Sequence, residues 1–182
     1  MTEAPSSDPL ALSRRWVERV VVGLGLCPFA ARPMARDVVR FALSPGADSD
    51  SIFAGCLDEA LRLTSEPAET LETTLYVVPA GLERFDDYLD MLWTLEAAFA
   101  QAGLEGVLQL ASFHPDYCFE GVHQDDPANW TNRSPLPMFH LIREEQLERA
   151  LAHFPDAEGV PGRNIALLRG MGSARIKALM DD

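Results

Sequence analysis

Residues 73–113, TTLYVVPAGLERFDDYLDMLWTLEAAFAQAGLEGVLQLASF, contain the pattern that decides the fold. The β-rich run at 73–78 predicts a strand, and Pro79-Ala80-Gly81 predicts the turn that closes it. Apolar residues then recur at helical spacing over 82–102, which predicts the longest helix of the chain. The segment 106–113 is again typical of a strand. The helix is expected to bury a stripe made of Phe85, Leu89, Leu92, Trp93, Leu95 and Phe99.

The alternation of strands and helices continues on both sides of this unit. The further elements expected are a helix from Pro9 capped by Asp8, strands at 37–44 and 138–142, and helices at 50–64, at 144–152 and within 164–180. The helix at 50–64 is expected to turn Ile52, Phe53, Cys56, Leu57, Ala60 and Leu61 inward. This order favours an α/β sheet with right-handed crossovers. We therefore predict a single α/β domain over residues 9–182, preceded by a disordered tail over 1–8. It comprises an N-terminal helix, a β-α-β-α-β core, a fourth strand after a long ordered loop, and a helical C-terminus.

Composition restricts the class of protein. The 182 residues fit one domain, and a hydrophobic fraction of 47% is enough for a core. The net charge of −13 disfavours nucleic acid as a partner. The apolar run at 20–31 is too short to cross a membrane, and the N-terminal residues lack the layout of a signal peptide. Three widely spaced cysteines do not form a disulfide framework. These features indicate a soluble, acidic, cytoplasmic protein; they do not indicate its oligomeric state.

The stretch Ser112–Arg143 is the candidate site. It holds three of the four histidines together with several acids, arginines and aromatic residues. A loop of this length in a compact domain is usually functional or disordered, and its aromatic residues argue against disorder. It also leaves the C-terminal end of a predicted strand, where open α/β sheets bind their ligands.

The first candidate chemistry uses His114, Asp116 and His140. His114 and Asp116 share one face if the strand before them continues, and His140 could face the same pocket from the next strand. His114 would then be the general acid/base and Asp116 its orienting partner. The three residues could also hold a divalent metal, although no tight ligand spacing such as HExxH is present. The alternative is a hydrogen-bonded core histidine at His140 and solvated acids in the loop.

Cys27 is a candidate nucleophile that would need His114 or His140 as its base. We expect it at the C-terminal end of the first helix, where the helix dipole disfavours a thiolate. The alternative interpretation is a small buried apolar residue beside the proline that ends the helix. No phosphate-binding glycine loop is present, so the sequence indicates no nucleotide cofactor.

Four residues near the end of the loop could bind a substrate. Arg133 and Arg143 could hold a carboxylate or phosphate through paired hydrogen bonds, and Asn132 and Ser134 could add further bonds. The alternative is an ion pair between Arg133 and Asp116, Asp125 or Asp126 that keeps the loop folded.

Three segments resemble a known family: LCPFA at Leu26–Ala30, SFHPDY at Ser112–Tyr117 and DPANWTNRSPLPMFHLIRE at Asp126–Glu144. The chain resembles the bacterial domain-of-unknown-function family 1415, whose members have about this length. The resemblance covers nearly the whole chain and implies a single intact domain, but it implies no activity.

We therefore expect a pocket built by Ser112–Arg143 and closed by the turn Leu26–Ala30. It would bind a small anionic molecule, and it could support acid–base or metal-assisted chemistry. The competing hypothesis is a non-catalytic interaction or assembly module, in which the loop 112–143 is an ordered structural cover. The sequence leaves open whether the protein is an enzyme.

Overall fold

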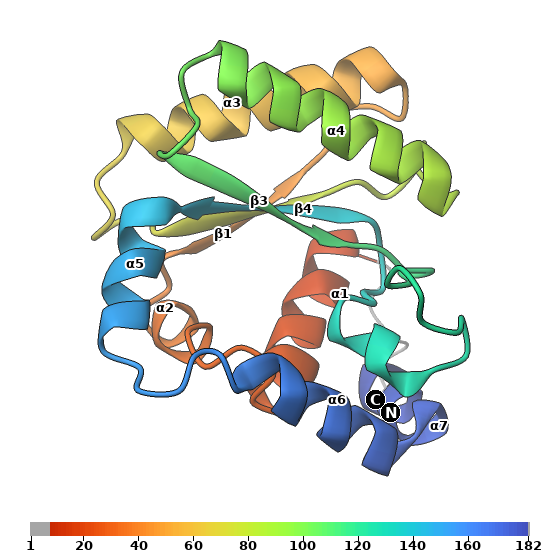
Figure 1. Ribbon diagram of the computed structural model, residues 1–182. Helices are drawn as coiled ribbons and strands as arrows, with labels where there is room; N and C mark the ends of the chain where they lie inside the picture. Colours follow the sequence, from red (N-terminus) through yellow and green to blue (C-terminus); the bar gives the residue numbers. More distant parts are fainter. Residues whose placement is uncertain (1–7, 182) are drawn as a thin grey trace, which may run out of the picture.

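The fold is a four-stranded mixed sheet covered by helices on both faces (Figure 1). The computed structural model describes residues 8–181. The strands lie in the order β1-β2-β4-β3, where β1 and β2 are parallel and β4 runs antiparallel to both β2 and β3. Their bounds are Val39–Leu43 for β1, Thr73–Val77 for β2, Leu108–Phe113 for β3 and Met138–Arg143 for β4. The last strand of the chain is therefore inserted between the second and the third.

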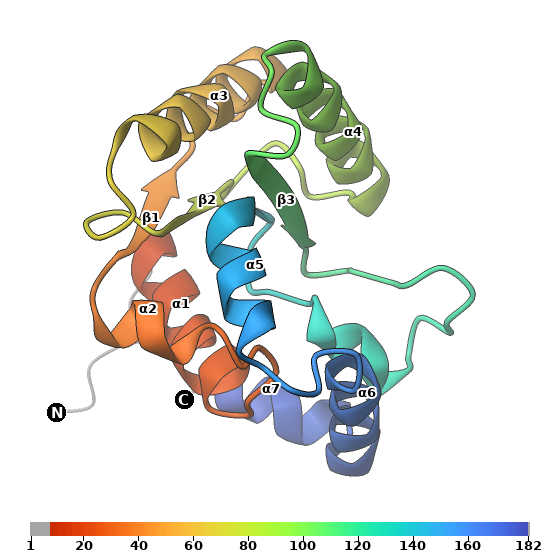
Figure 2. The ribbon, with the colours of Figure 1, turned by 60° about the vertical axis from the view of Figure 1, so that its left-hand side comes forward.

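Helices α3 (Ser49–Ser65) and α4 (Phe85–Gln101) lie together on one face of the sheet (Figures 1 and 2). Each connects two strands, and both connections advance in the same direction across the sheet, which places both helices on the same face. They bury one hydrophobic core against β2, β3 and β4, in which the large, fully buried side chains include Ile52, Leu63, Tyr76, Tyr88, Leu95, Phe139 and Leu141.

The opposite face carries the N-terminal and C-terminal helices and a second core. Its covering elements are α1 (Pro9–Trp16), the π-helical turn η1 (Val17–Val22), α2 (Ala31–Ala35), α5 (Glu144–Ala152), α6 (Val160–Met171) and α7 (Ser173–Asp181). A 3-10 turn, η2 (Pro127–Thr131), packs against α6 and α7. The second core includes Trp16, Val20, Leu75, Val77, Trp130, Met138, Leu168 and Ile176. Figure 2 shows α5 and α2 over this face of the sheet.

The predicted α/β fold and its order of elements are confirmed. The side chain of Asp8 accepts a hydrogen bond from the Leu10 N–H at 3.1 Å and so caps α1 as expected. The disordered tail was predicted for residues 1–8. Residues 1–7 lie outside the described residues, and Asp8 is the capping residue of α1. No helix within residues 8–181 is long and apolar enough to cross a membrane.

Two residues predicted to lie inward are exposed instead. Leu61 and Trp93 each keep 59% of their surface exposed. The buried stripe of α3 repeats at Ile52, Cys56 and Ala60, so Leu61 is rotated by one residue, about 100°, away from it. Trp93 is displaced in the same way from Leu92, because α4 buries Tyr88, Leu92, Leu95 and Phe99 and not the Trp93 side chain.

The buried hydroxyl of Tyr88 joins α4 to the two strands beneath it. It donates to the carbonyl of Met138 at 2.8 Å and accepts from the backbone N–H of Phe113 at 2.9 Å. Its side chain is fully buried and stacks on Phe139. Both hydrogen bonds form at the end where β3 and β4 meet the loop, so they fix the start and the finish of that loop.

We predict that Tyr88→Phe lowers the free energy of unfolding by about 1–3 kcal/mol, since it leaves a buried N–H and a buried carbonyl unpaired. Tyr117→Phe is the matched control, because its hydroxyl makes only a 3.4 Å contact with Ser112; a loss below about 0.5 kcal/mol is expected. Urea unfolding measures both variants, and equal losses would contradict the structural role assigned to Tyr88.

Candidate functional site

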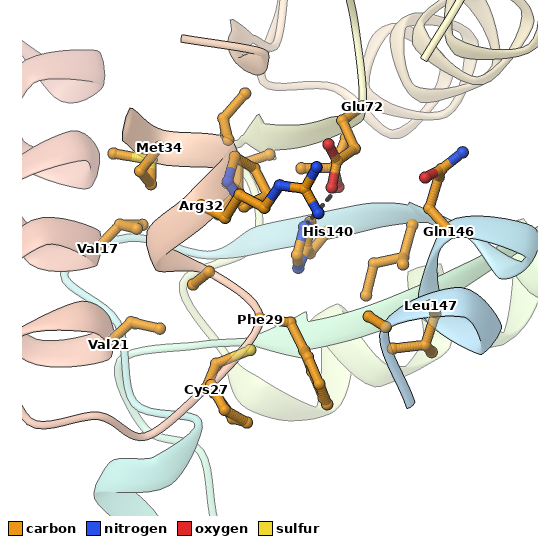
Figure 3. Close-up of a pocket in the computed structure, with 18 of the residues that line it drawn as sticks. Val17, Val21, Cys27, Phe29, Arg32, Met34, Glu72, His140, Gln146 and Leu147 are labelled. Atoms are coloured by element: carbon orange, nitrogen blue, oxygen red, sulfur yellow. Dashed lines mark hydrogen bonds between the residues drawn. The ribbon is translucent and has the colours of Figure 1, made fainter. Parts of the chain in front are cut away.

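A cavity of about 600 Å³ opens on the face of the sheet that carries α1, α2 and α5. Figure 3 shows it bordered by Val17 and Val21 on one side and by Leu147 of α5 on the other. Most of its lining is apolar, comprising Trp16, Val17, Val21, Pro28, Phe29, Ala30, Pro33, Met34, Val39, Leu75, Phe113, Ile142, Leu147 and Ala150. The polar lining residues are Cys27, Arg32, Arg36, Glu72, Thr73, His140, Arg143, Gln146, Arg149 and His153. This volume falls in the range of small-molecule sites.

His140 brings an imidazole to the sheet side of this cavity. It lies on β4 opposite Leu75 of β2 and Ala111 of β3, and Figure 3 shows its ring extending into the space that Cys27 and Phe29 border. Its Nε2 is 2.7 Å from the hydroxyl oxygen of Thr73. Burial lowers the pKa of His140 to about 4, so the ring is neutral at neutral pH.

Cys27 borders the same cavity from the turn between η1 and α2 (Figure 3). Our expectation that it ends a helix is wrong, because η1 ends at Val22. Burial raises the pKa of the Cys27 thiol, and the backbone N–H groups of Phe29 and Ala30 offset part of that rise. A neutral thiol and a neutral imidazole in one cavity are therefore the expected state, and not a thiolate–imidazolium pair.

Three arginines mark the mouth of the cavity. Arg32, Arg36 and Arg149 line it and are exposed, whereas Trp16, Val17 and Leu75 are buried and form its floor. Arg36 lies 3.6 Å from Glu72, and Arg149 pairs with Glu145. Arg32 makes no hydrogen bond or ion pair with any of the described residues. Glu72 is the single acidic residue among the described side chains that line the cavity.

Arg143, expected to bind a substrate, instead supports the backbone. It donates to the carbonyl of Leu71 at 3.2 and 3.0 Å and to that of Glu66 at 2.5 Å. These bonds hold the segment that leads into β2. Arg143 lines the cavity, but its guanidinium already has backbone acceptors.

His114 does not share the cavity with His140. It is fully buried on the α4 side of the sheet, where its ring lies 5.1 Å from that of Tyr88 and 5.3 Å from that of Phe85. Its Nε2 is 2.9 Å from the carbonyl of Leu82, and its Nδ1 accepts from the backbone N–H of Asp116. Burial lowers the pKa of His114, so its neutral ring serves as a structural hydrogen-bonding group.

The expected group of His114, Asp116 and His140 is therefore not assembled. β3 ends at Phe113, so the alternation assumed for the residues after it does not apply, and Asp116 is exposed. Cys27 and His114 do not form a pair either, because His114 is buried on the α4 side of the sheet. Cys27 and His140, by contrast, border one cavity. No cluster of three or more histidine, cysteine, aspartate or glutamate side chains suited to a metal occurs within residues 8–181.

The remaining predicted site residues hold the loop itself. Arg133 donates to the carbonyls of Tyr117 and Gln124, and Asn132 donates to that of Ser112. Ser134 is buried and donates to the carbonyl of Leu136 at 2.6 Å. None of these three is among the cavity-lining residues of the described chain. The middle of the loop therefore uses its polar groups internally.

The loop is held by two further sets of contacts that the sequence analysis did not predict. The ion pair predicted for Arg133 is formed instead between Asp126 and Arg169 of α6, at 2.7 and 3.0 Å. The hydrogen bond from Arg169 lowers the pKa of Asp126 to about 2. Asn129, which is fully buried, donates to the carbonyls of His123 and Gln124 and accepts from the N–H of Phe119.

Sequence reasoning missed Thr73, Arg32 and Arg149. They lie in three segments far apart in the chain, each inside or next to a regular element. Only the register of β2 against β4, which pairs Thr73 with Ile142 and Leu75 with His140, would have brought Thr73 to the histidine. That register cannot be derived from a single sequence.

Comparison with known proteins identifies one relationship. A family model described as "Protein of unknown function (DUF1415)" matches residues 10–178. No significant match was found among curated proteins or among solved structures.

The lowered pKa of His140 predicts a pH dependence of stability. An unfolded histidine has a pKa of about 6.5, so between pH 6.5 and 4 the unfolded chain binds a proton that native His140 does not. The free energy of unfolding should therefore fall as the pH falls through this range, with His140 contributing about 2–3 kcal/mol of the loss. Denaturant unfolding at pH 7 and pH 4.5 measures it.

His140→Leu should remove that part of the pH dependence and leave a smaller part from His114. His123→Gln is the control, because the His123 side chain is 80% exposed. This variant should leave the pH dependence of the free energy of unfolding unchanged. An NMR titration in which the His140 ring takes up its proton near pH 6.5 would contradict the prediction.

The hydrogen bonds of Asn129 allow us to predict how much the loop contributes to the stability of the protein. Asn129→Ala removes three hydrogen bonds made by a fully buried side chain and should lower the free energy of unfolding by about 2–4 kcal/mol. Gln124→Ala is the control, because Gln124 takes part through its backbone carbonyl and keeps it. A loss below about 1 kcal/mol for Asn129→Ala in urea unfolding would contradict an internally held loop.

Proposed function

The chain belongs to the DUF1415 family, and because the description of that family assigns no activity, we propose a function from the geometry of its cavity. The protein binds a small amphipathic anion. The apolar part of the ligand lies against the sheet, and its anionic group lies at the mouth beside the arginines. The single observation that carries this proposal is the combination of an apolar wall with three exposed arginines in one cavity.

Charge supports the choice of an anion. The chain as a whole carries −13, yet the mouth of the cavity gathers Arg32, Arg36 and Arg149 against two acids, Glu72 in the lining and Glu145 beside Arg149. A local positive region on an acidic protein concentrates small anions there while the remaining surface repels polyanions. This argument also retains our expectation that nucleic acid is not a partner.

Arg32 is the best-placed group to bind the anion directly. Arg36 and Arg149 have carboxylates near them, so an anion must compete for them. Arg32 has no such partner among the described residues, and a guanidinium offers paired N–H groups that match a carboxylate or a phosphate.

The electrostatics of the cavity favour binding over thiolate chemistry. Burial raises the pKa of Cys27 and lowers that of His140, and both shifts stabilise neutral groups in the free protein. Cys56, Cys27 and Cys118 form no disulfide, which supports our further proposal of a reducing, cytoplasmic location.

The alternative, a non-catalytic interaction module, is supported by the loop. The side chains of Asn129, Asn132 and Arg133 bind carbonyls of the loop or of its adjoining strand, as a structural cover would require. That observation concerns the loop and leaves the cavity without a role, so we favour ligand binding.

Binding measurements with matched ligands test the proposal. We expect decanoate or decyl phosphate to bind by isothermal titration calorimetry, and decanol to bind more weakly because it lacks the charge. Arg32→Ala should weaken binding of the anion about tenfold, as for loss of a charged hydrogen bond. Comparing the two anions identifies the preferred head group.

Arg19→Ala is the matched control, because Arg19 is an exposed arginine on η1 that does not line the cavity. Its affinity should equal that of the unmodified protein. Equal binding of decanol and decanoate would contradict the anionic specificity, and no binding of any of the three ligands would contradict the proposed function.

A further inference from the structure

Thr73 determines which nitrogen of His140 carries the proton. The Thr73 hydroxyl oxygen lies 2.6 Å from the carbonyl of Leu141 and 2.7 Å from Nε2 of His140. A carbonyl only accepts hydrogen bonds, and a hydroxyl has a single proton, so that proton is donated to Leu141. The hydroxyl oxygen must then accept from Nε2–H. Because the neutral ring carries one proton, Nδ1 is unprotonated.

Nδ1 of His140 is consequently an unused hydrogen-bond acceptor in the cavity. It has no partner among residues 8–181. It is also not one of the buried, unpartnered side-chain atoms of this region, which are Nε1 of Trp16 and Oγ1 of Thr74. The atom therefore remains accessible, in a cavity whose lining includes the apolar residues Leu75, Phe113 and Ile142.

Trp16 holds an unpaired donor beneath the surface of the same cavity. It is 2% exposed and lines the floor, and its indole N–H has no acceptor in the described part of the chain. Its ring packs edge-on against Phe113 at 5.1 Å, and Phe113 lies 6.3 Å from the His140 ring. A buried donor and a cavity acceptor that share one neighbour are unusual in an apolar wall, since buried polar groups are normally paired.

We propose that the amphipathic anion carries a hydroxyl on its apolar body, and that this hydroxyl donates a hydrogen bond to Nδ1 of His140. The inference rests on the proposed function and adds the substrate class, a hydroxylated amphipathic acid. The group that meets Nδ1 must be a donor.

A hydroxyl suits this position better than the other common donor, an ammonium group. A cation would have to lose its hydration against a largely apolar wall, and the one acidic residue of that lining, Glu72, already lies 3.6 Å from Arg36. It would also approach a cavity whose mouth already holds three arginines. A neutral hydroxyl has neither cost, and Nδ1 compensates its lost hydrogen bond to water.

Matched ligands of one chain length test the proposal. Decanoate and the 2-, 3- and 10-hydroxydecanoates differ only in the hydroxyl and its position. We expect at least one hydroxylated acid to bind about fivefold more tightly than decanoate, the gain typical of one added hydrogen bond. In His140→Leu this ratio should fall to about one, whereas in His123→Leu it should be unchanged.

NMR of the unmodified protein provides a test that needs no variant. Imidazole ¹⁵N shifts should show the proton of His140 on Nε2, and the Nδ1 resonance should shift on addition of the preferred hydroxydecanoate but not of decanoate. A proton found on Nδ1 overturns the proposal.

The outcomes separate this inference from the proposed function. If decanoate binds and no hydroxylated acid binds more tightly, the hydroxyl recognition is wrong and anion binding stands. If none of the acids binds, both are wrong.

Discussion

The insertion of β4 between β2 and β3 is the constraint on which the rest of the structure depends. As one of the two strands paired on both sides, β4 must supply apolar residues to both cores: Phe139 and Leu141 face α3 and α4, and Met138 lies in the core on the other face. Strict alternation along the strand then fixes His140 on the second face. A histidine in this register lies on the side of the sheet that α5 and α2 cover incompletely, where the cavity remains.

The same insertion explains the chemistry-rich loop. The chain must leave β3, cross the end of the sheet and return antiparallel beside it, so residues 114–137 pass through a long irregular path. An ordered segment without sheet pairing must satisfy its backbone groups by other means. Asn129 and Arg133 do this with side-chain bonds to carbonyls, and the Asp126–Arg169 pair ties the segment to α6. The abundance of polar residues is thus a consequence of the topology.

The sequence predicted the elements well and the site only in part. Helical and strand periodicity located β2, α4, α5 and the capping residue Asp8, because each depends on local spacing. It could not place Leu61 or Trp93, since one residue of rotation separates a buried helix position from an exposed one. It also grouped His114 with His140, because the sheet order was unknown and the strand was assumed to continue past Phe113. Of the expected lining, Cys27 and His140 do border one cavity, from opposite sides.

Phe113 shows why the loop and the cavity are linked although the loop's polar residues do not reach the cavity. Its backbone N–H is held by Tyr88 on the α4 side, and its ring packs on Trp16 and lies near His140 on the cavity side. The last residue of β3 therefore belongs to both faces of the sheet. Because His114 follows it directly and is fixed by Leu82 and Tyr88, the position of the cavity floor depends on how the loop begins. His114 thus supports the site indirectly, through the backbone that it anchors, whereas the His140 side chain itself faces the cavity.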